Sequence, residues 1–89
     1  MSEGKLMAEQ ARGERAAALL RDPLIAETFD ALEEKYINDW KDSSTVESRE
    51  TLFQMYQALM VVRDHLTEVV ETGSLAKLEI NLQRNPKRR

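Results

Sequence analysis

Several residue types are scarce or absent in this 89-residue sequence: it has no cysteine, one histidine, three glycines and two prolines. Without cysteine there is no disulfide, thiolate nucleophile or cysteine metal site, and a single histidine cannot build a histidine-based metal site. A sandwich or barrel of many short strands would need more glycine and proline for its turns. These absences favour helices and exclude most of the site chemistry of small proteins.

Long apolar runs are also missing. None exceeds five residues, as at 58–62, whereas a membrane-spanning helix needs about 20. The first ten residues include Glu3, Lys5 and Glu9, and they lack the apolar core of an export signal. We therefore expect no membrane association and a cytoplasmic location.

The sequence has no recognisable catalytic motif. The patterns GxxxxGK[ST], GxGxxG, GxSxG and HExxH do not occur. His65 lies close to Asp64 and Glu68, but a histidine at the edge of an apolar stripe is far commoner than a general base. The carboxylates of Glu27, Asp30 and neighbouring residues have helical spacing, which is typical of a solvated face more often than of a cation site. We expect no enzymatic activity, no cofactor, no metal and no small-molecule substrate.

The residues that are present predict helices in one small domain. Hydrophobic residues make up 42% and charged residues 33% of the chain, a balance typical of an amphipathic globular protein. Asp22 followed by Pro23 is a typical helix start, with an N-cap and a proline at the first helical position, and an earlier helix should end near Arg21. The helix from Pro23 then carries an apolar stripe of period 3.6: Ile25, Phe29, Leu32, Tyr36 and Trp40.

A longer helix is predicted to follow. Ser44 and Glu47 fit a capping box, so the helix should begin near Thr45, and Thr72 with Gly73 predicts its end after about 27 residues. Its apolar stripe consists of Leu52, Met55, Tyr56, Leu59, Val62, Leu66, Val69 and Val70.

Residues 74–84 fit two patterns. Leu75, Leu78 and Leu82 have helical spacing, whereas Leu78, Ile80 and Leu82 alternate as in a strand; we favour a helix because no other strand is expected. The predicted fold is all-α, a small bundle of three to four helices with a long central helix packed on a shorter amphipathic one. Residues 1–84 would form a single helical domain, and residues 85–89 a basic, flexible C-terminal end.

Charge is unevenly distributed along the chain. The net charges of residues 1–22, 23–44, 45–73 and 74–89 are 0, −4, −3 and +4. This asymmetry favours head-to-tail contacts or an anionic partner at the C-terminal end. Arg84, Lys87, Arg88 and Arg89 are candidate nucleic-acid contacts, although no aromatic residue lies among them to stack on a base.

Aromatic residues supply the candidate protein interface. Tyr36 and Trp40 could either close the core, which we favour, or anchor a partner. Phe53 and Met60 lie beside the main stripe and widen the apolar surface. Since a few helices in 89 residues make a thin core, some of this surface could be covered by another chain.

The arrangement of helix faces and caps over residues 14–78 resembles that of a known group of proteins. The residues that carry the resemblance are Ala18-Leu19-Leu20-Arg21-Asp22-Pro23-Leu24, Glu27, Phe29, Leu32-Glu33, Tyr36, Trp40, Arg49-Glu50, Gln57-Ala58-Leu59, Val62-Arg63, His65-Leu66, Gly73 and Leu75-Ala76. Together they resemble small helical proteins encoded among tailed-bacteriophage and prophage genes, near head and packaging functions. The resemblance implies a phage product in the host cytoplasm or the virion, and it carries no catalytic residues.

These observations lead to three hypotheses. The first is a non-enzymatic, phage-related structural or interaction protein that self-associates or docks on a head or packaging assembly, with itself or a phage or host protein as partner. The second is a packaging accessory that binds nucleic acid through its basic end. The third is a host-directed inhibitor whose acidic helix face imitates DNA.

Overall fold

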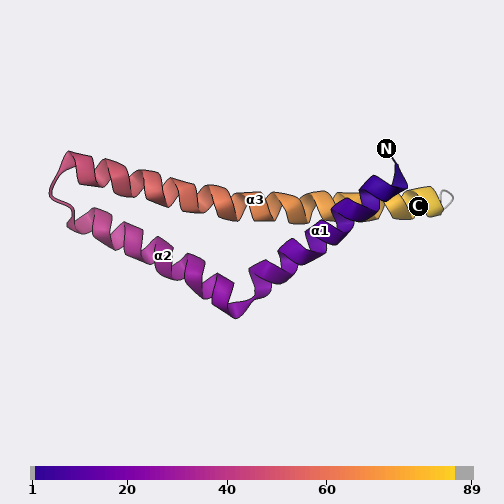
Figure 1. Ribbon diagram of the computed structural model, residues 1–89, viewed down its shortest axis with the longest axis horizontal. Helices are drawn as coiled ribbons and strands as arrows, with labels where there is room; N and C mark the ends of the chain where they lie inside the picture. The colour runs from indigo at the N-terminus through magenta and orange to yellow at the C-terminus, as the bar shows by residue number, and fades with distance from the viewer. Residues whose placement is uncertain (1, 86–89) are drawn as a thin grey trace. The chain divides into compact units, whose positions relative to one another are not determined.

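The structure, a computed structural model that describes residues 2–85, consists of three helices (Figure 1). They are α1 (Glu3–Arg21), α2 (Pro23–Asp42) and α3 (Val46–Arg84), and no strand occurs within residues 2–85. The all-α prediction is confirmed, with three helices and not four. The chain divides into two compact units, which we call the terminal unit, α1 to Leu20 with α3 from Leu66 onward, and the middle unit, Arg21–His65.

The predicted start of α2 is confirmed. Asp22 has extended backbone angles (φ −63°, ψ 122°), and its carboxylate accepts hydrogen bonds from the backbone N–H of Leu24 at 2.8 Å and of Ile25 at 3.4 Å. Pro23 occupies the first turn, where it has no N–H to leave unpaired. The cap and the proline together fix where α1 ends and α2 begins.

The start of α3 differs from the prediction by one residue. The Thr45 hydroxyl accepts a hydrogen bond from the Ser48 N–H at 3.1 Å, so the capping residue is Thr45 and not Ser44. The side chain of Ser43 adds hydrogen bonds to the Thr45 carbonyl and to the Ser48 hydroxyl. The serine and threonine hydroxyls of this loop thus supply acceptors and donors for the first turn of α3.

The predicted end of the long helix at Gly73 is wrong, because α3 continues to Arg84. Residues 74–84 are helical, as favoured. Gly73 has no positive φ, so it does not serve as a left-handed helix stop. It lies instead where two backbones meet: a Cβ on Gly13 would lie 2.8 Å from the Gly73 Cα, and a Cβ on Gly73 would lie 2.7 Å from the Gly13 Cα.

This glycine contact organises the terminal unit, in which α1 crosses α3 (Figure 1). Its buried side chains are few: Leu6, Ala16, Ala76 and Ile80, with exposures of 2–4%. Beyond them Arg84 forms an ion pair with Glu3 across the two helices at 2.5 Å. Small residues at the crossing let the helices approach closely enough for the larger Leu6 and Ile80 to be enclosed.

The middle unit is packed differently. None of residues 21–65 is buried. The stripe of α2 is half-buried at Ile25, Phe29, Leu32 and Tyr36, and so are Leu52, Tyr56, Leu59 and Met60 of α3. Met55 and Val62, which were predicted to belong to the α3 stripe, are 42% and 54% exposed. The half-buried positions 52, 56, 59 and 63 repeat every 3.5 residues, which leaves 55 and 62 on the flank of the helix.

Candidate protein–protein interface

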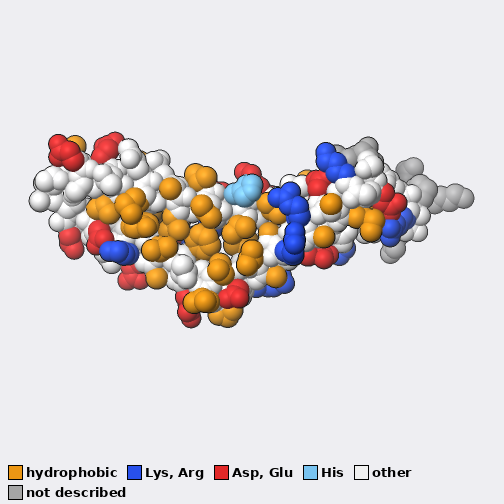
Figure 2. All heavy atoms as spheres, in the orientation of Figure 1, with side chains coloured by type: hydrophobic (Ala, Val, Ile, Leu, Met, Phe, Trp, Pro, Cys, Tyr) orange, Lys and Arg blue, Asp and Glu red, His pale blue; other side chains and the backbone are white. Residues whose placement is uncertain are grey.

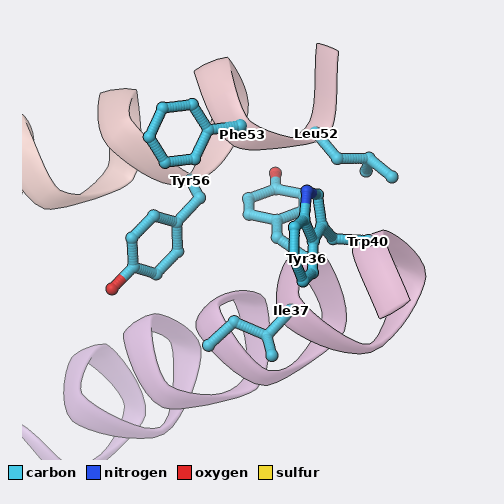
Figure 3. A pocket seen from close by; sticks show the side chains of 6 residues that line it. All are labelled: Tyr36, Ile37, Trp40, Leu52, Phe53 and Tyr56. Carbon is cyan, nitrogen blue, oxygen red and sulfur yellow. The ribbon is translucent and has the colours of Figure 1, made fainter. Parts of the chain in front are cut away.

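An apolar groove lies between α2 and α3 in the middle unit, with a volume of about 310 Å³. Its lining residues are Tyr36, Ile37 and Trp40 from α2, and Leu52, Phe53 and Tyr56 from α3. Figure 3 shows the Trp40 and Tyr36 side chains rising from α2 toward α3, with Phe53 and Tyr56 beside them. Side chains one turn apart on each helix thus present four aromatic rings to a single hollow.

The groove side chains are accessible to a partner. Trp40 is 45% exposed, Phe53 50% and Ile37 36%. In Figure 2, hydrophobic side chains gather on the visible face over α2 and the N-terminal half of α3. Large apolar side chains left open together in one hollow are typical of protein interaction sites, whereas single exposed ones are ordinary.

Two arginines contact aromatic rings of the middle unit. The Arg49 guanidinium lies 5.7 Å from the centroid of the Trp40 ring, at the groove. The Arg63 guanidinium lies 5.3 Å from the centroid of Phe29 and is 3.5 Å from both Asp30 and Glu33. Such contacts stabilise the orientation of the rings, and they place positive charge at the margin of the apolar surface.

The predicted interface residues divide by exposure. Tyr36, Trp40 and Phe53 all line the groove, Tyr36 being half-buried and the other two exposed. Met60 is half-buried and is not a lining residue.

Sequence reasoning missed the contribution of Ile37, Leu52 and Tyr56 to this site. Leu52 and Tyr56 were assigned only to the core stripe, and Ile37 was not considered because it lies outside the α2 stripe. Ile37 lies three residues before Trp40, and this helical spacing could have indicated that Ile37 widens the apolar stripe at that end of α2.

The candidate nucleic-acid residues lie at the C-terminal end. Arg84 is described, and its guanidinium is engaged by the Glu3 carboxylate, with Nε donating at 2.7 Å. Lys87, Arg88 and Arg89 lie outside the described residues, as does most of the predicted flexible end at 85–89.

The acidic residues of α2 are not arranged around a cation. Asp30 and Glu33 are near Arg63, and Asp39 forms an ion pair with Lys35 at 2.8 Å, whose hydrogen bond and charge raise the pKa of Lys35. Across residues 2–85 no group of three His, Asp or Glu side chains could hold a metal ion. His65 is exposed on α3 and does not line the groove. None of the described helices is long and apolar enough to cross a membrane.

Comparison with known proteins gives no match. The chain is similar to no protein-family model, no curated protein and no solved structure. The groove must therefore be interpreted from its own geometry.

Proposed function

We propose that this chain is a non-enzymatic helical interaction protein of phage or prophage origin, which works by self-association or by docking on a larger head or packaging assembly. The observation that carries the proposal is the open aromatic groove in a unit that has no buried side chain. A partner that fills the groove would remove apolar area from water, and each 100 Å² removed stabilises a complex by about 2.5 kcal/mol before the costs of association.

The chemistry of the groove supports binding over catalysis. Its lining is hydrocarbon and aromatic ring apart from two tyrosine hydroxyls and the indole N–H, and it includes no carboxylate, histidine or lysine that could act as an acid or base at neutral pH. Rigid aromatic anchors in a shallow hollow suit an apolar helix face, recognised through side chains one turn apart.

Site-directed photo-cross-linking in cells tests this function. Phe53 would be replaced by benzoylphenylalanine, an aromatic cross-linker that conserves the ring, in cells that produce the protein together with its natural neighbours. We expect a specific cross-linked product from position 53, identified by mass spectrometry as a head or packaging protein or as this chain itself. The matched control is Gln54, the exposed neighbouring position outside the groove. The same weak products from both positions would contradict the proposal.

Nucleic-acid binding is the alternative function, and it rests on the charge of +4 in residues 74–89. The pairing of Arg84 with Glu3 leaves Lys87, Arg88 and Arg89 as its main carriers. Deleting residues 85–89 should then abolish binding to double-stranded DNA and remove its salt dependence. Unchanged affinity after the deletion would exclude this role of the basic end.

A further inference from the structure

A second apolar surface lies on α3, in the terminal unit. Leu75, Leu78 and Leu82 are 66%, 56% and 51% exposed. Their spacing of three and four residues places them on one helix face, and that face is opposite Gly73, Ala76 and Ile80, which are buried against α1. We call these three leucines the leucine stripe. Intramolecular packing on α1 therefore leaves this stripe uncovered.

The leucine stripe has the form that the aromatic groove would accept. Helices that bind apolar grooves insert side chains at positions i, i+3 and i+7, which is the spacing of these three leucines. The groove offers rings and branched aliphatic side chains from two helices as the receiving surface. One protein thus exposes both an apolar helix face and an apolar hollow.

Charge favours the same pairing. The middle unit, residues 21–65, has five Lys and Arg against ten Asp and Glu, a net charge of −5, whereas the terminal unit has eight Lys and Arg against six Asp and Glu, a net charge of +2. Asp42 and Glu50, each two residues from a groove residue, are exposed. Groove against groove would bring two negative units together, while the stripe on the groove would bring opposite charges together.

We infer that the aromatic groove of one copy binds the leucine stripe of a second copy, so that the chain assembles head to tail. This inference rests on the proposed function and names its partner. Because the two contacting surfaces differ, a bound pair retains one free groove, on one copy, and one free stripe, on the other. Such a heterologous contact continues into a ring if the rotation closes and into an open chain if it does not.

Two variants test the inference, each placing a carboxylate in one surface. Phe53→Asp alters the groove and Leu82→Asp alters the stripe, both at half-exposed positions where the fold should survive, as circular dichroism would verify. Gln54→Asp and Asn81→Asp are the matched controls, since each gives the same change in charge at an exposed neighbouring position. The measurement is sedimentation velocity of the full chain at two protein and two salt concentrations.

The expected results are specific to head-to-tail contact. Wild type and both controls should form species larger than a dimer, whose mass falls as salt rises, and each variant alone should associate at least about tenfold more weakly. An equimolar mixture of Phe53→Asp and Leu82→Asp should form a dimer and stop there, because one intact groove meets one intact stripe.

Three results would overturn it. A Leu82→Asp variant that dimerises as wild type does, while Phe53→Asp stays monomeric, would indicate a symmetric groove-to-groove contact. Variants that assemble as wild type does would exclude both surfaces from the contact. A monomeric wild type would exclude self-association, yet a position-53 cross-link to a different protein would still support the proposed function.

Discussion

The terminal and middle units are both built from a pair of helices, yet they differ in how far they bury their side chains. The terminal unit brings Gly13 and Gly73 into backbone contact and encloses Leu6 and Ile80 at 2% and 4% exposure. The middle unit has larger side chains but encloses none of them. Small residues allow a close crossing and a sealed contact, whereas bulky rings hold two helices further apart and leave a hollow. The smaller residues thus make the tighter unit.

The largest expected effect comes from filling the glycine crossing. Gly13→Leu places a Cβ 2.8 Å from the Gly73 Cα and 3.1 Å from the Val69 carbonyl oxygen, and backbone cannot move aside as a side chain can. We expect the free energy of unfolding to fall by about 3–5 kcal/mol in urea denaturation followed by circular dichroism. Gly4→Leu is the control, since a Cβ there meets nothing within 4 Å. Equal stability of the two variants would contradict the close contact.

Truncating a side chain should distinguish enclosed from open positions. Ile80→Ala removes a side chain that is 4% exposed and should cost about 2–4 kcal/mol of unfolding free energy. Phe53→Ala removes a larger side chain that is 50% exposed, and at concentrations where the protein is monomeric it should cost less than about 1 kcal/mol. Leu82→Ala, two residues from Ile80 and 51% exposed, controls for the helix itself. If Phe53→Ala lowered the unfolding free energy more than Ile80→Ala does, the distinction between enclosed and open positions would be wrong.

The cap at Asp22 should have an intermediate effect on the middle unit. Asp22→Ala leaves the N–H groups of Leu24 and Ile25 without their carboxylate acceptor, and we expect a loss of about 1 kcal/mol, measured by thermal unfolding. Asp22→Asn should retain most of the stability, because asparagine is an equally good cap. If both variants lose the same stability, then the negative charge of Asp22, and not its capping hydrogen bonds, supplies the stabilisation.

The smallest effect should come from the exposed ion pair of α2. The hydrogen bond and charge of Asp39 raise the pKa of Lys35 above its ordinary value of 10.5. A folded-state pKa above the unfolded one means that the stabilisation is complete below the ordinary lysine pKa and is lost as pH rises through the raised value. Asp39→Asn should therefore lower the pKa of Lys35 in an NMR titration, with little change in unfolding temperature.

A second variant on the same helix is the control for Asp39→Asn. Glu34→Gln removes a carboxylate from α2 without removing the hydrogen bond between Lys35 and Asp39 at 2.8 Å, so the pKa of Lys35 should stay raised. A pKa that falls equally in both variants would show that the acidity of α2 as a whole is responsible.

Sequence alone predicted the parts of the fold that depend on local chemistry. Asp22 and Pro23 satisfy the orphan N–H groups of α2 within four residues of chain, so their pattern is sufficient. Gly73 was misread because the same residue type serves both as a helix stop and at a close crossing, and its partner, Gly13, lies 60 positions away. Nothing near either glycine in the sequence distinguishes the two roles.

The candidate site was predicted only in part, because it too depends on contacts between residues that are distant in the sequence. Trp40 and Phe53 could be selected as large rings beside an apolar stripe, but their exposure depends on how far α2 stands from α3. That separation is decided by all the side chains between the two helices. Sequence therefore identified large apolar side chains that could contact a partner, without showing that a hollow lies between them.

The contact between Gly13 and Gly73 also determines the alignment of α1 along α3. Sliding α3 by one turn would set Val69 or Ala76 opposite Gly13, and sliding it by two would set Leu66 or Ile80 there. Each of these residues has a Cβ where only hydrogen fits at 2.8 Å. The terminal unit thus rejects wrong registers by steric exclusion, so its apolar positions can change in size without changing the alignment.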